Sequence, residues 1–183
     1  MRWLNISECT VTDKTLYQGF IFKMQIIDDY LDIDYFNKLS ALFHSNEFPW
    51  YYQSNITLKD DIGDGAFVHT FYRGENTNSS LLPALAPLLN KLEIKNLLRA
   101  KANLYPLTDN IVIHQRHIDL PQLPNPYKTA LLYINTNNGQ TIFDDESVDS
   151  VANRIAIFDQ TMYHRSTTCT DQKIRITLNI NYV

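Results

Sequence analysis

The second half of the chain is a succession of short segments in which apolar and polar residues alternate, and this pattern limits the fold most. Turn sequences such as P-Q-L-P-N-P and N-T-N-N-G separate the segments. The segments cover residues 97–105, 111–119, 129–135, 140–143, 154–158, 163–166 and 174–182. Many short strands at this spacing predict an all-β sandwich or barrel.

The first half predicts helices and strands that pack against this β-rich core. Residues 24–31 have the pattern of a strand that ends in a turn, and Asp32 or Asp34 can cap a helix that ends near His44. A second helix is expected over residues 81–92, where Pro87 should kink or shorten it.

Further segments of the first half complete the domain. F-P-W-Y-Y at residues 48–52 is expected to be extended, D-D-I-G-D-G at 60–65 is a turn sequence, and residues 66–74 predict a strand. We expect a single domain over residues 1–183, mainly β with flanking helices (α+β). Residues 1–95 would form the helical and strand cover and residues 96–183 the core.

The charge and hydropathy of the chain disfavour two classes of partner. The net charge is -4 and the pI is near 5.7, which gives no electrostatic basis for binding nucleic acid. The N-terminus lacks the apolar segment of a signal peptide, and the longest apolar runs are too short to span a membrane. We therefore expect a soluble, cytoplasmic protein without a membrane partner; the sequence leaves the oligomeric state unknown.

The segment I-V-I-H-Q-R-H-I-D-L, from Ile111 to Leu120, holds two histidines and an aspartate within six positions. On a strand, side chains at positions i and i+2 share a face, with their Cα atoms roughly 6–7 Å apart. His117 and Asp119 should therefore point the same way, whereas His114 should face the other side unless a bulge intervenes.

A third metal ligand is available in Q-T-M-Y-H-R-S-T, which contains His164. Two histidines and one carboxylate on one triangular face leave the remaining octahedral positions open, an arrangement that suits Fe(II). Arg175 follows in K-I-R-I-T-L-N-I-N-Y, where it shares a strand face with Thr177, Asn179 and Asn181. Its planar guanidinium could donate two parallel hydrogen bonds to a carboxylate.

The order H-I-D at 117–119, H at 164 and R-I-T at 175–177 resembles the H-x-D…H…R-x-[ST] pattern of 2-oxoglutarate/Fe(II)-dependent oxygenases. Segments that resemble the prolyl-hydroxylase-like branch are A-N-L-Y-P at 102–106, L-L-Y-I-N at 131–135, N-N-G-Q-T-I-F at 137–143 and N-R-I-A-I-F-D at 153–159. The chain departs from that branch at Gln140 and Asn153, which replace glycines, and after Tyr105, where a glycine is missing. The resemblance covers about residues 97–183, and the compact length is similar to that of short oxygenases from bacteriophages.

This resemblance implies a double-stranded β-helix, or jelly roll, of the cupin-like type. It implies Fe(II) on His117, Asp119 and His164, with 2-oxoglutarate as co-substrate and O₂ as oxidant, and it leaves ascorbate open as a reductant. Arg175 would bind the distal carboxylate of 2-oxoglutarate, helped by Tyr133 or Thr177, with Tyr105 as a further candidate. No side chain is needed as a general base.

Three functions remain open at this point. The first is hydroxylation of a protein or peptide side chain, with proline as the leading case, in the cytoplasm or, for a phage-encoded protein, in the host cytoplasm. The second is oxygenation of a nucleotide or small molecule; the nucleobase-demethylating branch has a second arginine six positions after the first, and Asn181 stands here. The third is a non-catalytic metal-binding jelly roll.

Other conspicuous polar side chains favour structural roles. His69 alternates with Phe67 and Phe71 and is expected to be a buried histidine with its hydrogen bonds satisfied. Arg73 and Arg165 are expected to be solvated at the edge of a pocket. Whether residues 48–65 form a lid is not predicted.

Overall fold

The computed structural model describes residues 24–54, 65–123 and 126–183. The turn predicted at residues 60–65 lies almost entirely outside these ranges. The described elements are β1 (Gln25–Ile27), α1 (Ile33–His44), β2 (Tyr51–Gln53), β3 (Ala66–Arg73), β4 (Asn76–Thr77), a 3₁₀ turn (Leu82–Leu85), α2 (Ala86–Lys91), β5 (Leu97–Pro106), β6 (Lys128–Tyr133), β7 (Gln140–Phe143), β8 (Ser147–Asp149), β9 (Ile155–Asp159), β10 (His164–Ser166) and β11 (Ile174–Tyr182).

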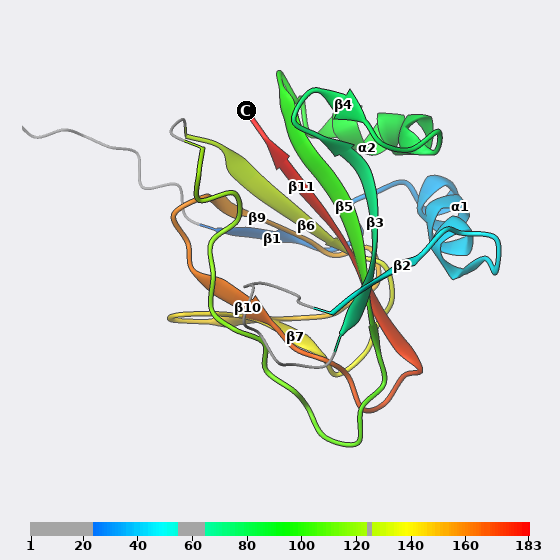
Figure 1. Cartoon of the computed structure of the whole chain (residues 1–183), viewed down its shortest axis with the longest axis vertical. Coiled ribbons are helices and arrows are strands. Elements are labelled where there is room, and N and C mark those ends of the chain that lie inside the picture. Colours follow the sequence, from blue (N-terminus) through cyan, green and yellow to red (C-terminus); the bar gives the residue numbers. More distant parts are fainter. Residues whose placement is uncertain (1–23, 55–64, 124–125) are drawn as a thin grey trace, which may run out of the picture.

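The strands form two antiparallel sheets of unequal size. The large sheet has the order β1-β9-β6-β11-β5-β3-β2, with β4 paired to β3, and the small sheet has the order β10-β7-β8. Helices α1 and α2 lie outside the large sheet, while β7 and β10 lie across from it on the other side (Figure 1). This is the mainly β architecture with flanking helices that the strand pattern predicted.

Strand β11 shows how the sequence pattern separates the core from the site. Its even-numbered side chains pack with the helices in the main core, which includes Ile176, Leu178 and Ile180. Its odd-numbered side chains lie on the opposite face, where Arg175, Thr177 and Asn179 line a cavity. The predicted alternation is therefore confirmed, and it places polar groups between the two sheets.

Local signals account for the helices. The carboxylate of Asp32 accepts hydrogen bonds from the backbone N–H groups of Asp34 and Tyr35, so Asp32 is the N-cap of α1. Phe36, Leu39 and Phe43 form the buried stripe of this helix. The predicted second helix is divided into the 3₁₀ turn and α2, with Pro87 in the first turn of α2, where a missing N–H is tolerated.

The first half of the chain also extends the large sheet. Strand β1 pairs with β9, and β3 pairs with β5.

Asn153, which replaces a glycine of the oxygenase pattern, has a positive φ of 63°. Its side-chain amide accepts from the N–H and donates to the C=O of Leu31, both at 2.9 Å. Asparagine thus keeps the left-handed backbone that it tolerates better than most residues, and it fastens the N-terminal segment to the core.

The prediction of a regular strand over residues 111–119 is wrong. The segment forms only isolated bridges, from Ile113 to Thr167 and from His117 to His164. Between the two bridges, the chain advances four residues from Ile113 to His117 but only three from His164 to Thr167. This excess of one residue is a bulge. The extra residue reverses the expected direction of His114, which is buried at 5% exposure and stacks on Tyr105 with ring centroids 5.1 Å apart.

Candidate metal and co-substrate site

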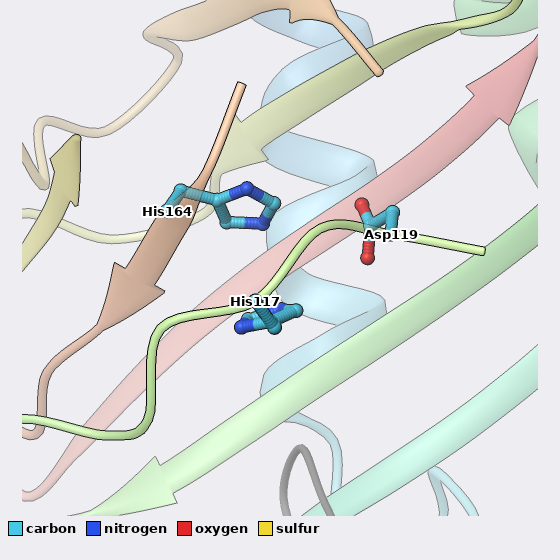
Figure 2. A group of neighbouring side chains, drawn as sticks. All are labelled: His117, Asp119 and His164. Atoms are coloured by element: carbon cyan, nitrogen blue, oxygen red, sulfur yellow. The ribbon is translucent and has the colours of Figure 1, made fainter. Parts of the chain in front are cut away.

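Three predicted metal ligands converge between the sheets. His117 and Asp119 lie on the irregular segment after β5, and His164 begins β10 (Figure 2). One ligand atom from each residue lies within 4.8 Å of the others. His117 and His164 also exchange two backbone hydrogen bonds of 2.9 Å, so the backbone pairing itself sets the spacing of the two imidazoles.

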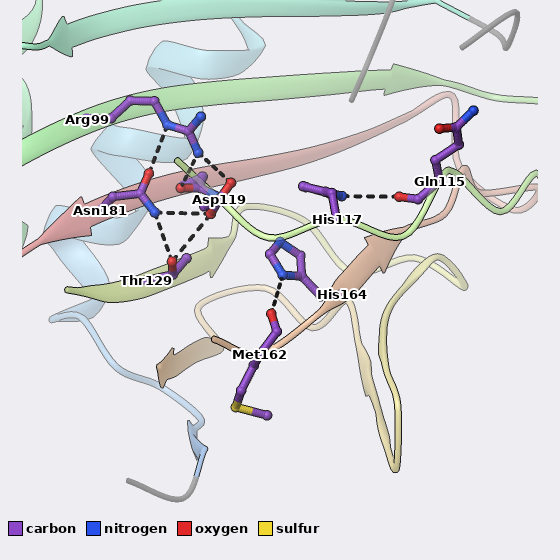
Figure 3. A network of polar contacts seen from close by, with 9 residues as sticks. Arg99, Gln115, His117, Asp119, Thr129, Met162, His164 and Asn181 are labelled. Carbon is purple, nitrogen blue, oxygen red and sulfur yellow. Dashed lines mark hydrogen bonds and ion pairs between the residues drawn. The ribbon is translucent and has the colours of Figure 1, made fainter. Parts of the chain in front are cut away.

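Backbone carbonyls orient both imidazoles. The Nδ1 of His117 lies 3.1 Å from the carbonyl oxygen of Gln115, and the Nδ1 of His164 lies 3.1 Å from that of Met162 (Figure 3). An Nδ1–H that donates to a carbonyl leaves the Nε2 lone pair free to bind a metal. Burial, and to a smaller extent the neighbouring His164, lowers the pKa of His117 to about 4, so its ring is neutral near pH 7.

Asp119 is held by four side chains of the large sheet. Its Oδ1 accepts a 2.6 Å hydrogen bond from Nη2 of Arg99. Its Oδ2 accepts from the amides of Asn179 and Asn181 at 2.9 and 3.0 Å and from Oγ1 of Thr129 at 3.3 Å. Figure 3 shows the contacts from Asn181 and Thr129. Burial alone would raise the pKa of Asp119, but Arg99, His164 and the bond from Asn179 outweigh it and hold the pKa below its usual range. The carboxylate is therefore ionised and fixed.

This donor set fits Fe(II). Two imidazoles whose Nδ1 atoms face backbone carbonyls and one ionised carboxylate, gathered on one side, form the ligand group expected of a non-haem Fe(II) centre with open positions. The hydrogen bonds from backbone carbonyls and asparagine amides supply the outer contacts that orient such ligands.

Arg175 lies deep in the same cavity, with its side chain fully buried. Its Nε donates to Ser150, its Nη1 to the carbonyl of Thr167 and its Nη2 to Thr141, at 2.8, 3.2 and 3.2 Å. A guanidinium has five N–H donors, so these three contacts leave two, one on each terminal nitrogen. Those two donors match the two oxygens of a carboxylate.

Gly139 makes room for this arginine. A Cβ placed on Gly139 would lie 2.5 Å from Cδ of Arg175 and 2.8 Å from the carbonyl oxygen of Thr168. Only a glycine therefore fits beside the guanidinium stem, which explains the glycine of the N-N-G-Q-T-I-F segment in physical terms.

The other predicted co-substrate residues surround Arg175. The ring centroids of Tyr105 and Tyr133 lie 5.4 and 5.8 Å from its guanidinium carbon. The hydroxyl of Tyr133 donates to Oγ1 of Thr141, and that of Tyr105 accepts from Ser166. Tyr105, Thr141 and Thr177 line a cavity of about 230 Å³ that also contains the three metal-ligand candidates.

Some residues of this cavity were not predicted. Arg99, Lys101, Asn103 and Tyr105 occupy alternate positions of β5 and all line the cavity, yet only Tyr105 was singled out. Their alternation with Leu98, Ala100, Ala102 and Leu104 was a visible signal that they share one face. Ser150, by contrast, gave no signal, because it reaches Arg175 only through the fold.

Two structural expectations had different outcomes. His69 is buried, and its Nδ1 and Nε2 lie 2.8 Å from the carbonyl oxygen of Pro49 and from Oγ of Ser79, so the prediction of a satisfied histidine is confirmed. Arg73 is exposed as predicted, but it also lines the cavity. Its position directly opposite Arg99 in the β3–β5 pairing places it there.

Comparisons with known proteins define the fold class. No family model and no curated protein matches the chain. Solved structures do match, and the fold is that of 2OG-Fe(II) oxygenases. One is an oxidoreductase of the 2OG-Fe(II) oxygenase family from Burkholderia pseudomallei, at 13% identity and a TM-score of 0.65, covering 87% of this chain and 84% of that one.

Two further structures are prolyl hydroxylases. A prolyl-4-hydroxylase from Pseudomonas putida matches at 16% identity and a TM-score of 0.61, over 87% of this chain and 91% of that one. A prolyl hydroxylase from Trichoplax adhaerens, in complex with a hypoxia inducible factor peptide, matches at 17% identity and a TM-score of 0.61, over 87% and 82%. An epimerase and a carbocyclase, both α-ketoglutarate dependent, match as well, so the fold does not specify one reaction.

Within the described residues, no helix has both the length and the apolar character needed to cross a membrane.

Proposed function

We propose that the protein is a 2-oxoglutarate- and O₂-dependent Fe(II) oxygenase that hydroxylates a C–H bond. The observation that carries this proposal is the convergence of His117, Asp119 and His164, with both imidazoles oriented from Nδ1, in one cavity with a buried arginine that keeps two N–H donors free. The fold supports it independently of these residues.

Each group in the cavity then has a chemical task. His117, Asp119 and His164 would hold the iron, which supplies the oxidative chemistry when it is bound together with 2-oxoglutarate and O₂. Arg175 would bind the distal carboxylate of 2-oxoglutarate through its two remaining donors, with the hydroxyl groups of Tyr133, Tyr105, Thr141 or Thr177 nearby. The buried walls around Arg175 would exclude water from the co-substrate.

The leading substrate is a protein or peptide side chain such as proline. Two prolyl hydroxylases, one of them with a bound peptide, share the fold over most of both chains. Assays of candidate peptides, nucleotides and small molecules for a one-oxygen gain that depends on 2-oxoglutarate would identify the substrate. Such a gain only on a nucleotide would overturn the peptide assignment.

A spectroscopic experiment separates an oxygenase from a metal-binding module. Anaerobic addition of Fe(II) and 2-oxoglutarate should produce a weak visible charge-transfer band, because the co-substrate chelates the metal. A colourless sample at saturating concentrations of both would contradict the proposal.

The variant His164→Ala tests the metal site directly. It removes one of three ligands, so we expect loss of iron retention and of succinate formation from 2-oxoglutarate. His44→Ala, which changes an exposed histidine at the end of α1, is the matched control and should retain both. Equal succinate formation by His164→Ala and the unmodified protein would exclude His164 from the site.

A further inference from the structure

The end of the cavity remote from Arg175 is strongly basic. Four basic residues line the cavity as a whole, namely Arg73, Arg99, Lys101 and Arg175, and Asp119 is the only acidic residue among the described lining residues. Arg175 pairs with Tyr105 in the β11–β5 register, and Lys101 lies four residues before Tyr105 along β5. At about 3.3 Å per residue, roughly 13 Å of strand separates the two basic ends.

Strand pairing concentrates three of these charges. Arg73 and Arg99 are direct cross-strand partners, and Lys101 lies two positions from Arg99 on the same face. Directly opposed side chains have Cβ atoms about 4.5–5.5 Å apart, and like charges in such a pair destabilise a sheet. The stability of the sheet therefore gives no reason for this arrangement.

Of the three, only Arg99 forms an ion pair within the described residues, although Asp119 also acts electrostatically on Lys101. Arg99 forms an ion pair with Asp119 and donates to Asn181. Within the described ranges, neither Lys101 nor Arg73 forms an ion pair or a side-chain hydrogen bond. Burial and then the neighbouring Arg99 lower the pKa of Lys101 to about 8, so it is still mostly charged near pH 7. A partly buried cation without a partner is costly, and a bound anion would relieve that cost.

The proposed co-substrate and metal do not provide the missing anion. Fe(II) and Arg175 together would offer three positive charges to the two carboxylates of 2-oxoglutarate, and the distal carboxylate would bind Arg175 at the far end. Asp119 carries a single charge and is already held by Arg99, Asn179 and Asn181. Lys101 and Arg73 are therefore left for a third molecule.

We propose that the substrate carries a carboxylate or phosphate group, and that Lys101 and Arg73 bind this group at the end of the cavity remote from Arg175. The inference rests on the proposed oxygenase function and narrows its substrate class. It favours an acidic side chain in a peptide, or an acidic small molecule, over an uncharged prolyl segment, which would leave both cations unpaired.

Matched acidic and neutral probes test the proposal. The protein is loaded anaerobically with Mn(II), a metal that does not turn over, and with 2-oxoglutarate, so that the metal site and Arg175 are occupied. N-acetylaspartic acid amide is then titrated against N-acetylasparagine amide, and phosphoserine against serine, by calorimetry. Binding of the acidic member of at least one pair should be about tenfold tighter or more, which corresponds to one charge-assisted contact, and added salt should weaken it. The pair that responds distinguishes a carboxylate from a phosphate.

Variants connect this preference to the two residues. Lys101→Met and Arg73→Gln should each reduce affinity for the acidic probe about tenfold, while leaving Mn(II) and 2-oxoglutarate affinities unchanged. Lys38→Met, on the exposed face of α1, makes the same charge change and should have no effect. A melting temperature of Lys101→Met equal to or above that of the unmodified protein would show that the lysine is not needed for folding. A large decrease in the melting temperature of Lys101→Met would assign Lys101 a structural role and overturn the proposal.

Two failures are distinguishable. Absence of Mn(II) and 2-oxoglutarate binding in the unmodified protein would overturn the oxygenase function. Normal binding of both, with acidic and neutral probes equal or with no acidic probe bound, would overturn only the anionic substrate. Full affinity for the acidic probe in both Lys101→Met and Arg73→Gln would also overturn the anionic substrate.

Discussion

At the scale of single residues, Arg175 is the most demanding group in the cavity, because every nitrogen of its buried guanidinium has a fixed contact. Arg175→Lys keeps the charge but replaces a planar fork by a single ammonium group. We expect the affinity for 2-oxoglutarate to fall about tenfold or more, since one parallel hydrogen bond is lost, while Mn(II) affinity stays the same. Calorimetry on the Mn(II)-loaded variant measures both, with Arg154→Lys, which alters a partly exposed ion pair to Asp28, as control. Unchanged 2-oxoglutarate affinity in Arg175→Lys would show that the distal carboxylate binds elsewhere.

Lys101 gives a prediction that depends on pH. The pKa of Lys101 is about 8 in the folded protein and 10.5 without the fold, mainly because of burial. Between these values the folded state binds fewer protons than the unfolded state, so the free energy of unfolding rises with pH; below pH 8 the cost of the buried charge is present in full. The free energy of unfolding of Lys101→Met should therefore exceed that of the unmodified protein by about 2 kcal/mol at pH 7. This value is smaller than the full pKa difference would give, because the side chain is partly exposed to solvent.

The measurement is urea unfolding of both proteins at several pH values. The advantage of Lys101→Met should shrink steadily between pH 8 and 10.5, whereas Lys38→Met should show no such trend. A stability difference that does not depend on pH would mean that the charge of Lys101 is not the source of the effect.

At the scale of elements, the turn before β9 fastens the N-terminal segment to the core. Asn153→Gly keeps the positive φ but removes both side-chain hydrogen bonds to Leu31, and should cost about 1–2 kcal/mol of unfolding free energy. Asn153→Ala should cost about 1 kcal/mol more, because a Cβ without polar compensation disfavours this backbone conformation. Chemical denaturation ranks the three proteins, and equal stability of Asn153→Gly and the original protein would refute the role of the side chain.

The strands differ in how well the sequence predicts their bounds and the directions of their side chains. Residues 174–182 were predicted correctly, bounds and faces included, because a long strand between a core and a cavity must alternate strictly. Residues 111–119 alternate as well, but their partner β10 spans only His164–Ser166, and a bulge that the pattern does not encode turns His114 inward. Strand β8, Ser147–Asp149, was missed because three residues rich in polar groups carry no period.

The residues of the cavity also fall into those that the sequence predicts and those that it does not. His117, Asp119, His164 and Arg175 were predictable because a specific chemistry requires those residue types in that order. Arg99 and Arg73 acquire their positions from cross-strand pairing between β5 and β3, and Ser150 meets Arg175 across 25 residues of sequence. Such contacts depend on register, which one sequence specifies only weakly.

At the scale of the whole molecule, the metal-ligand candidates connect the two sheets. His164 belongs to β10 of the small sheet, whereas Asp119 is held by Arg99, Asn179 and Asn181 of the large sheet. Binding of a metal and 2-oxoglutarate should therefore stabilise the entire domain. At about 100 times the dissociation constant, ligand binding adds about 2.7 kcal/mol, which is a rise of roughly 5–10 °C in melting temperature for a chain of this size.

Calorimetric melting with Mn(II) and 2-oxoglutarate, each alone and together, tests this coupling. The pair should raise the melting temperature more than either compound alone, because the metal provides part of the binding site of the co-substrate. His164→Ala should lose most of the increase, and Arg175→Lys should lose mainly the part that 2-oxoglutarate contributes. An equal increase in His164→Ala and the unmodified protein would place the metal outside the junction of the two sheets, since a site that bridges them cannot keep its full affinity without the ligand from β10.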